Sequence, residues 1–311
     1  MAAGSACWRS CEPSGSRRRG NAVTDWRDLV QLLVNGLMTG SMLMLPAIGF
    51  NCIFAVLRYP NFAVAGYATI GAFAGWVANV QFGLPAWMAL AAAFAVAGLA
   101  GLLAEEVALK PLRPSGALTV AIASVALTLL IENIVRFFFG NDLRGYDLPV
   151  MRDWRFDGIR VNPQQLHDTL YAIAAAAALF ALLAFTRMGR AMRAVADNPQ
   201  LADIKGVDPD RIARVAVVIG AGLAGFGGML LGIDTSIDPL TGFRVVLSVF
   251  AAAVVGGLGS IPGAALGALV IGVGEEAAGV LLQPAYRTVT GFLAILVVLS
   301  IRPQGLLGRA A

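Results

Sequence analysis

Long apolar segments recur along this chain of 311 residues and constrain its fold more than any other feature of the sequence. A helix needs about 20 mostly apolar residues to cross the hydrocarbon core of a bilayer. Hydrophobic residues make up 58% of the chain and charged residues only 14%, whereas a soluble domain carries about 25% charged residues. These observations predict an all-α integral membrane protein.

The apolar segments define the expected membrane helices. The clearest are Leu29–Phe50, Ala86–Ala104, Ala117–Phe139, Leu170–Phe185, Ile212–Ile233 and Thr288–Ile301. Two further segments contain glycines that we expect to break them: Phe62–Val80, and Val245–Leu282, which is long enough for two short helices. The chain is therefore predicted to contain roughly eight or nine transmembrane or re-entrant helices in one domain, residues 27–309. The polar residues 1–26 are predicted to form a disordered tail.

Basic residues predict which loops face the cytoplasm, because Lys and Arg are enriched on that side of a membrane. If loop 187–211 is cytoplasmic, loop 140–168 is external, since successive helices alternate in direction. The basic residues then expected beside loop 187–211 are Lys110, Arg113, Arg302 and Arg309. The basic tail with Arg17–Arg19 favours an N-terminus inside the cell, although this depends on whether residues 50–80 cross the membrane once or re-enter.

The external loop contains a hairpin signal. Trp154–Val161 alternates apolar and polar residues around Asp157-Gly158, and Asp-Gly suits a type I′ turn, in which both central residues have positive φ. This hairpin would either cap the bundle or dock an external partner, and the sequence favours neither.

The charged loop contains two consecutive helix starts. Asn198 can cap a helix whose first residue is Pro199, and Asp208 can cap the next one, because their side-chain oxygens accept from free helical N–H groups. The first helix is expected to run to about Lys205 and to stop at Gly206, a residue suited to the left-handed C′ position. Its Leu201 and Ile204 form a small apolar face. Because so short a helix is marginal alone, we expect another molecule or element to pack against it.

Polar residues inside the predicted spans need a partner or a purpose, because ionisable groups cost about 2.5–3.5 kcal/mol there. Glu132 and Arg136 are spaced for a local ion pair. Of Glu275 and Glu276, we expect Glu275 to face the bundle interior and Glu276 to lie nearer the external end. The other polar candidates for the transport pathway are Asn35, Asn61, Ser124 and Thr128. Hydrogen bonding between helices is the alternative role for all of them.

The stretch VVGGLGSIPGAALG, residues 254–267, is unusually rich in glycine. It is not a phosphate-binding loop, since Gly257 and Gly259 are not followed by glycine at the required spacing and apolar residues flank them. Gly259, Gly263 and Gly267 recur every four residues and would line one helix face for close packing. Pro262 would interrupt the helix and favour a break. Packing is the main expected role of these glycines, and Gly257, Gly259 and Gly263 are also candidates for the pathway.

Several of these segments together resemble the branched-chain amino acid permeases of bacterial ABC importers. The resemblance covers about residues 29–309 and is carried by GRAMRAVADNPQLADIKGVDPDRI, LAGFGGMLLG, VVGGLGSIPGAALGALVIGVGEE and IRPQGLLGR. It implies a permease subunit in the bacterial cytoplasmic membrane and matches Glu275 to an acidic position of the family. It also implies that residues 197–206 form the coupling helix, which seats in a groove of the ATPase subunit. The coupling residues so implied are Asp197, Asn198, Pro199, Leu201, Ile204, Lys205 and Gly206.

The resemblance implies three kinds of partner besides lipid: a second permease chain, identical or homologous, two ATPase subunits, and an external solute-binding protein. We expect no cofactor, no metal and no nucleic acid on this chain, with ATP bound by the partner subunit. Neither of the two lysines, Lys110 and Lys205, lies in a P-loop pattern. With one histidine and scattered carboxylates the sequence has no cluster of catalytic groups, so an enzyme is not expected.

One departure from the family leaves the substrate open. Members commonly carry His-Gly just after the Asn-Phe-Ala that corresponds to residues 61–63, whereas this chain has Val64-Ala65 there. Branched-chain or related amino acids are the expected substrates, and relatives that move urea or short amides are the alternative. An ion-coupled secondary transporter or channel is a further alternative, supported mainly by Glu275.

Overall fold

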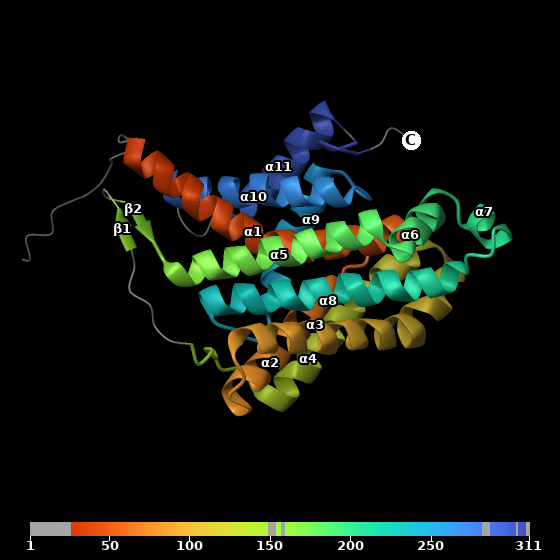
Figure 1. Cartoon of the computed structure of the whole chain (residues 1–311), viewed down its shortest axis with the longest axis horizontal. Coiled ribbons are helices and arrows are strands. Elements are labelled where there is room, and N and C mark those ends of the chain that lie inside the picture. The colour runs from red at the N-terminus through yellow and green to blue at the C-terminus, as the bar shows by residue number, and fades with distance from the viewer. Residues whose placement is uncertain (1–25, 149–153, 157–158, 282–286, 303, 309–311) are drawn as a thin grey trace, which may run out of the picture.

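The computed structural model describes residues 26–148, 154–156, 159–281, 287–302 and 304–308 and is almost entirely helical (Figure 1). Within these residues, six helices are long and apolar enough to cross a membrane. They are α1 (Trp26–Leu57), α3 (Ala86–Ala104, extended by irregular turns to Ser115), α4 (Ala117–Phe139), α5 (Pro163–Phe185), α8 (Pro209–Thr235) and α10 (Ile261–Leu281). The all-α membrane fold predicted from the sequence is thus confirmed.

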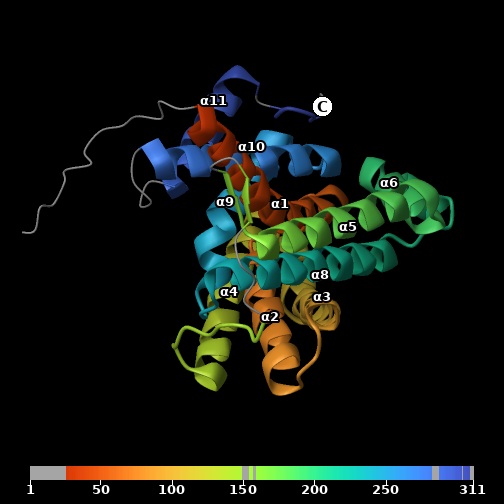
Figure 2. The ribbon, with the colours of Figure 1, turned by 60° about the vertical axis from the view of Figure 1, so that its left-hand side comes forward.

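Shorter helices complete the described bundle. These are α2 (Val64–Trp76, prolonged by a π-helical turn to Gln81), α9 (Thr241–Gly256) and α11 (Arg287–Ile301). Two further short helices, α6 (Arg187–Asp197) and α7 (Pro199–Ile204), lie in the loop between α5 and α8. With the six long helices, α2, α9 and α11 make nine apolar helices among the described residues, in agreement with the predicted eight or nine transmembrane or re-entrant helices. Figure 2 shows α2, α3 and α4 on one side of α8, and α10 and α11 beyond α1 on the other.

The bundle has two distinct ends, visible at the right and left of Figure 1. We call them the α7 end, which carries α6 and α7, and the hairpin end, which carries β1 (Trp154–Phe156) and β2 (Ile159–Val161). The two strands pair antiparallel with Trp154 opposite Val161, which confirms the predicted hairpin. Its turn residues, 157–158, lie outside the described residues. Helix α5 begins at Pro163, so residues 163–168 of the predicted loop are helical.

The start of α1 lies at the hairpin end, because Gln31 bonds to the backbone of Arg160 in β2. Its Nε2 donates to Arg160 O over 2.9 Å, and its Oε1 accepts from Arg160 N over 2.8 Å. The prediction that the start of the chain shares a side with loop 187–211 is therefore wrong for α1. The reason is that residues 58–81 do not re-enter. They pass once from the α7 end, where Arg58 donates to Ala196 O, to the opposite end, where Trp76 Nε1 donates to Gly145 O. Of the predicted tail, only Trp26 is described, and it begins α1.

The predicted parity of the other loops is confirmed. Lys110 lies at the α7 end, where its Nζ is 3.5 Å from Asp210 Oδ2 at the start of α8. Arg302 directly follows α11 at the same end, since Leu306 N donates to Val255 O in the last turn of α9 over 2.8 Å. Arg309 lies outside the described residues.

Glycines let the central helices approach closely. A Cβ added at Gly71 of α2 would lie 2.2 Å from Gly225 Cα of α8, and one at Gly49 of α1 would lie 2.4 Å from Gly220 O. Such contacts are possible only between backbones without side chains, as in many membrane bundles. The prediction that Gly66, Gly71 and Gly75 break the segment 62–80 is wrong, because here the same glycines face close neighbours on a continuous helix.

Candidate functional site

Helix α7 begins and ends where the sequence predicts. Asn198 Oδ1 accepts from Leu201 N over 3.0 Å, and Pro199 follows as the first helical residue. At the other end Gly206 has a φ of +84°, which favours glycine. The side chain of Asp208 then caps α8, accepting from Asp210 N over 2.9 Å. Local capping chemistry therefore fixes α7 between two stop signals.

The apolar residues of α7 point in opposite directions. Ala202 is buried, whereas the side chains of Leu201 and Ile204 are 54% and 81% exposed. Successive helical residues are about 100° apart, so Leu201 and Ile204 share a face that is turned away from Ala202. The other residues predicted for coupling, Asp197, Asn198, Pro199, Lys205 and Gly206, are exposed around them. The structure thus brings all seven predicted coupling residues together as one protruding surface, which we call the α7 surface.

The α7 surface rests on an apolar cluster at the base of the loop. Ala202 packs among the buried residues Cys52, Met192, Val195, Ile212 and Ala216. Met192 and Val195 belong to α6, a helix that was not predicted within the charged loop. The spacing of Met192 and Val195, together with Thr186 as an N-cap, is the signal that predicts α6: Gly189 N donates to Thr186 Oγ1 over 3.1 Å.

Three of the polar pathway candidates surround the connection between α1 and α2. Ser124 Oγ of α4 accepts from Phe62 N over 3.0 Å, and Thr128 Oγ1 donates to Phe62 O over 3.0 Å. Asn61 Oδ1 accepts from Ala63 N over 3.0 Å, while its buried Nδ2 has no hydrogen-bond partner among the described residues. Ser124 and Thr128 thus satisfy the backbone of an irregular segment, which is the hydrogen-bonding alternative considered for them.

The acidic pair of α10 connects two different helices near the hairpin end. Both carboxylates are half-buried. Glu275 accepts a hydrogen bond from Ser248 Oγ of α9, and Glu276 Oε1 accepts from Asn35 Nδ2 of α1 over 3.4 Å. Asn35 also accepts from Gln31 Nε2 over 2.7 Å, so it lies below the hairpin contact. Each acidic residue therefore has a polar partner on a neighbouring helix.

The predicted ion pair between Glu132 and Arg136 is not formed in the described part of the chain. Glu132 Oε1 and Arg136 Nε are both buried, and neither has a hydrogen-bond partner there. Glu132 is only 2% exposed and points into the bundle, whereas Arg136 is half-buried one turn nearer the helix end.

The glycine-rich stretch forms a sharp turn between α9 and α10, which confirms the predicted break. Gly257 and Gly259 have φ values of +108° and +83° and precede α10. The prediction that Gly259 lines one helix face with Gly263 and Gly267 is wrong for Gly259, because it lies in the turn. Gly263 and Gly267 do face α9: added Cβ atoms would lie 2.2 Å from Gly256 O and 2.1 Å from Ala252 O.

Pro262 does not interrupt a helix, because it is the second residue of α10, where a missing N–H costs nothing. The turn is instead held by Asn51, a buried residue of α1. Its Nδ2 donates to Gly257 O over 3.1 Å and to Ser260 O over 3.0 Å, and its Oδ1 accepts from Gly259 N over 3.3 Å. Asn51 was not predicted, because it directly follows the expected span Leu29–Phe50; an amide with apolar residues on both sides was nevertheless a usable signal.

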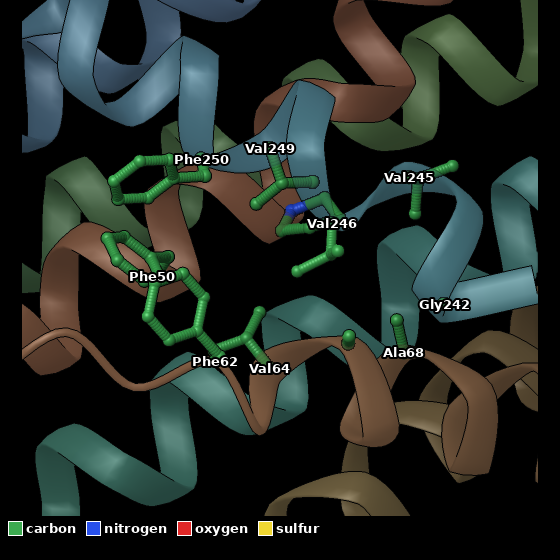
Figure 3. Close-up of a pocket in the computed structure, with 11 residues that line it drawn as sticks. Phe50, Phe62, Val64, Ala68, Gly242, Val245, Val246, Val249 and Phe250 are labelled. Atoms are coloured by element: carbon green, nitrogen blue, oxygen red, sulfur yellow. The ribbon is translucent and has the colours of Figure 1, made fainter. Parts of the chain in front are cut away.

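A narrow apolar crevice lies between α1, α2 and α9 (Figure 3). The rings of Phe50, Phe62 and Phe250 gather at one side of it, with Phe62 and Phe250 centroids 5.4 Å apart. Val64, at the position where the resembling family commonly has His, contributes to its lining, as do Val246 and Val249. Its free volume of about 10 Å³ is too small for an amino acid, so the crevice is closed in this conformation.

The eight pathway candidates do not line one common cavity. Asn61, Ser124 and Thr128 surround the start of α2, Asn35 and Glu275 lie toward the hairpin end, and the three glycines belong to the turn and first helical turn at the α7 end. The crevice is lined by none of these eight side chains.

Comparison with known proteins gives a consistent set of matches. Residues 32–300 match the family described as branched-chain amino acid transport system / permease component. The chain is 33% identical to the high-affinity branched-chain amino acid transport system permease protein LivH of Salmonella typhimurium, over 90% of this chain and 96% of LivH. BraD of Pseudomonas aeruginosa, with the same description, is 32% identical with the same coverage. LivM of Escherichia coli K12 is 24% identical over 84% of this chain and 66% of LivM.

Among solved structures, PsaBC from Streptococcus pneumoniae in complex with Fab aligns with a TM-score of 0.46 and 15% identity. The alignment covers 88% of this chain and 92% of that one.

Proposed function

Because this chain belongs to the branched-chain amino acid transport permease family, we propose that it is the membrane subunit of an ATP-driven importer of branched-chain or related amino acids. The observation that carries the proposal is the α7 surface. Leu201 and Ile204 are exposed on a short capped helix, within a loop of charged residues at one end of the bundle. Burying such side chains against a partner is worth about 1.5–3 kcal/mol each, which suits a movable interface with an ATPase subunit.

The α7 end would face the cytoplasm of a bacterial cell. Lys110, Arg113 and Arg302 lie there together with the basic residues of α6. The positive-inside rule assigns an end enriched in Lys and Arg to the cytoplasm. The hairpin end would then face outward, where an external solute-binding protein delivers the substrate. A second permease chain, identical or homologous, would complete the pathway. Two ATPase subunits would bind and hydrolyse the ATP, and this chain would carry no cofactor of its own.

The crevice favours an amino acid with an apolar side chain over urea or a short amide. Its walls are Phe, Val, Ala, Gly and Pro residues and present apolar surface alone. In the importer, contacts at the α7 surface would shift the population between closed and open forms of this crevice.

The carboxylate of Glu275 is the observation that would support an ion-coupled carrier instead. Dependence of uptake on ATP rather than on an ion gradient, measured in vesicles, distinguishes the two.

The proposal is tested by placing a charge on the α7 surface. We expect Leu201→Asp and Ile204→Asp to leave the protein inserted at its normal level but to reduce co-purification with its ATPase, and ATP-driven uptake, at least about tenfold. Gly206→Pro should act in the same way, because proline cannot adopt a φ of +84°.

The matched control is Ala194→Asp, which adds the same charge to an exposed position of α6. It should retain both the ATPase and uptake. If Leu201→Asp binds the ATPase and transports as the unmodified protein does, the assignment of the α7 surface is wrong.

A further inference from the structure

Three ion pairs at the α7 end join the start of α8 to the connection between α3 and α4. Asp210, in the first turn of α8, lies 3.5 Å from Lys110 Nζ and 3.8 Å from Arg113 Nη1. Arg214 Nε, one turn further along α8, lies 3.5 Å from Glu106 Oε1. The helix that follows α7 is therefore attached electrostatically to residues 105–115, although the two segments are far apart in sequence.

Arg113 continues this attachment into the protein interior. Its Nη2 and Nε lie 2.6 and 3.1 Å from Glu105 Oε1, and the carboxylate of Glu105 is completely buried. Tyr59 OH donates to the same carboxylate, with distances of 3.0 and 2.9 Å to its two oxygens. A buried carboxylate needs such partners, since a charge left unpaired in the interior is strongly unfavourable. Asp210, Arg113, Glu105 and Tyr59 therefore form one continuous line from surface to interior.

Tyr59 belongs to the irregular segment between α1 and α2, residues 58–63. The same segment has a second connection to loop 187–211, besides the one through Asp210. The Arg58 guanidinium donates to Ala196 O in the last turn of α6. On its other side, Ser124 and Thr128 of α4 hold the backbone of Phe62. Segment 58–63 thus receives contacts from α4, α6 and the α3–α4 connection at once.

Phe62 places the end of this segment in the crevice. Its ring centroid is 5.4 Å from that of Phe250 in α9 and 6.2 Å from that of Phe50 in α1 (Figure 3). A displacement of segment 58–63 therefore changes the width of the crevice.

At the opposite end of the line, α7 and the start of α8 form one unit. Val207 N donates to Ala202 O over 2.9 Å, and buried Ala202 packs in the cluster that also contains Ile212 and Ala216 of α8. A partner that pushes on α7 must therefore also displace Asp210.

We propose that Asp210, Arg113, Glu105 and Tyr59 are positioning residues. They carry movement of α7 and the start of α8 to Phe62, and this movement widens the crevice. The inference rests on the proposed function, because an ATPase acting on the α7 surface supplies the movement. Coupling between distant sites is carried by connected networks of packed side chains, hydrogen bonds and ion pairs of this kind. The four residues act in series, so interrupting the line at any point has the same consequence.

The test uses the full-length protein with its ATPase partner, reconstituted in vesicles together with the binding protein. The variants are Asp210→Asn, Tyr59→Phe and the double substitution. Asp210→Asn removes two ion pairs that are partly exposed to solvent. Because such pairs contribute little to stability, we expect this variant to fold. The matched control is Arg211→Gln, which removes the exposed ion pair with Asp208 at the same helix start. The readouts are co-purification of the ATPase and the amount of amino acid transported per ATP hydrolysed.

We expect each single variant to retain the ATPase and to transport at least about fivefold less per ATP, within the usual range of coupling effects. Because the residues act in series, the double variant should be no worse than either single variant, while Arg211→Gln stays unchanged. Unchanged transport per ATP in Asp210→Asn or Tyr59→Phe would overturn the inference, as would effects that multiply in the double variant. Failure of the proposed function is distinguishable, since the unmodified protein would then neither retain an ATPase nor respond to Leu201→Asp.

Discussion

The central helices and the α7 end are held together by different physical means. Where α1, α2 and α8 cross, glycines bring backbones into direct contact, as at Gly71 over Gly225 and Gly49 over Gly220. At the α7 end, by contrast, N-caps and ion pairs such as those of Asn198 and Asp210 are added to the small apolar cluster beneath Ala202. Close-packed backbones tolerate almost no displacement, whereas polar side chains can break and remake contacts. The bundle centre is accordingly suited to act as a rigid body, and the α7 end to move.

The largest expected effect comes from disturbing the glycine contacts. Gly71→Ala would place Cβ 2.2 Å from Gly225 Cα, so whole helices must shift, at a cost of about 3 kcal/mol or more. We expect a severe loss of monodisperse protein after extraction in detergent and a large fall in melting temperature. The control is Gly145→Ala, whose Cβ would meet no atom within 4 Å. Equal stability of the two variants would show that the bundle centre is not the rigid body inferred above.

An intermediate effect is expected from Arg113→Gln. This change leaves the buried carboxylate of Glu105 with Tyr59 alone and should destabilise the protein by about 3 kcal/mol. Thermal unfolding followed by size-exclusion chromatography measures the effect. Adding Glu105→Gln removes the uncompensated charge, so the double variant should recover much of the lost stability. If the second substitution instead lowers the melting temperature further, burial of that charge is not what makes Arg113 necessary.

The smallest expected effect is local. Asn198→Ala removes the N-cap of α7 and should cost about 1 kcal/mol, confined to this helix. Hydrogen exchange should become faster in the amides of residues 201–207 and stay unchanged in α8. Gln200→Ala, at an exposed position without a capping role, is the control. Unaltered hydrogen exchange of residues 201–207 in Asn198→Ala would contradict the view that the local cap holds this helix.

Features that depend on neighbouring residues in the chain were predictable from the sequence. The bounds of α4 were predicted as observed, since Ala117 and Phe139 mark a sharp change from apolar to polar residues. Asn198 and Asp208 cap helices because the bonds they make span only two or three residues. The same holds for the hairpin and for the break between α9 and α10.

Features that depend on how helices rotate against one another were not predictable. Successive residues differ in direction by about 100°, so sequence alone could not show that Asn35 meets Glu276 or that Glu105 meets Tyr59. The glycines of α2 were misread for a related reason. Their backbone freedom favours a break in isolation, but contact with α8 outweighs that preference in the bundle.

The lengths of α9 and α11 have a consequence for the surrounding lipid. They contain 16 and 15 residues, so α9 spans about 24 Å where a typical hydrocarbon core measures about 30 Å. Such a mismatch is relieved by thinning the adjacent bilayer. Thinning would bring lipid headgroups closer to the Asp238–Arg244 ion pair at the start of α9. The acyl-chain length of the host membrane would then affect the surroundings of this ion pair.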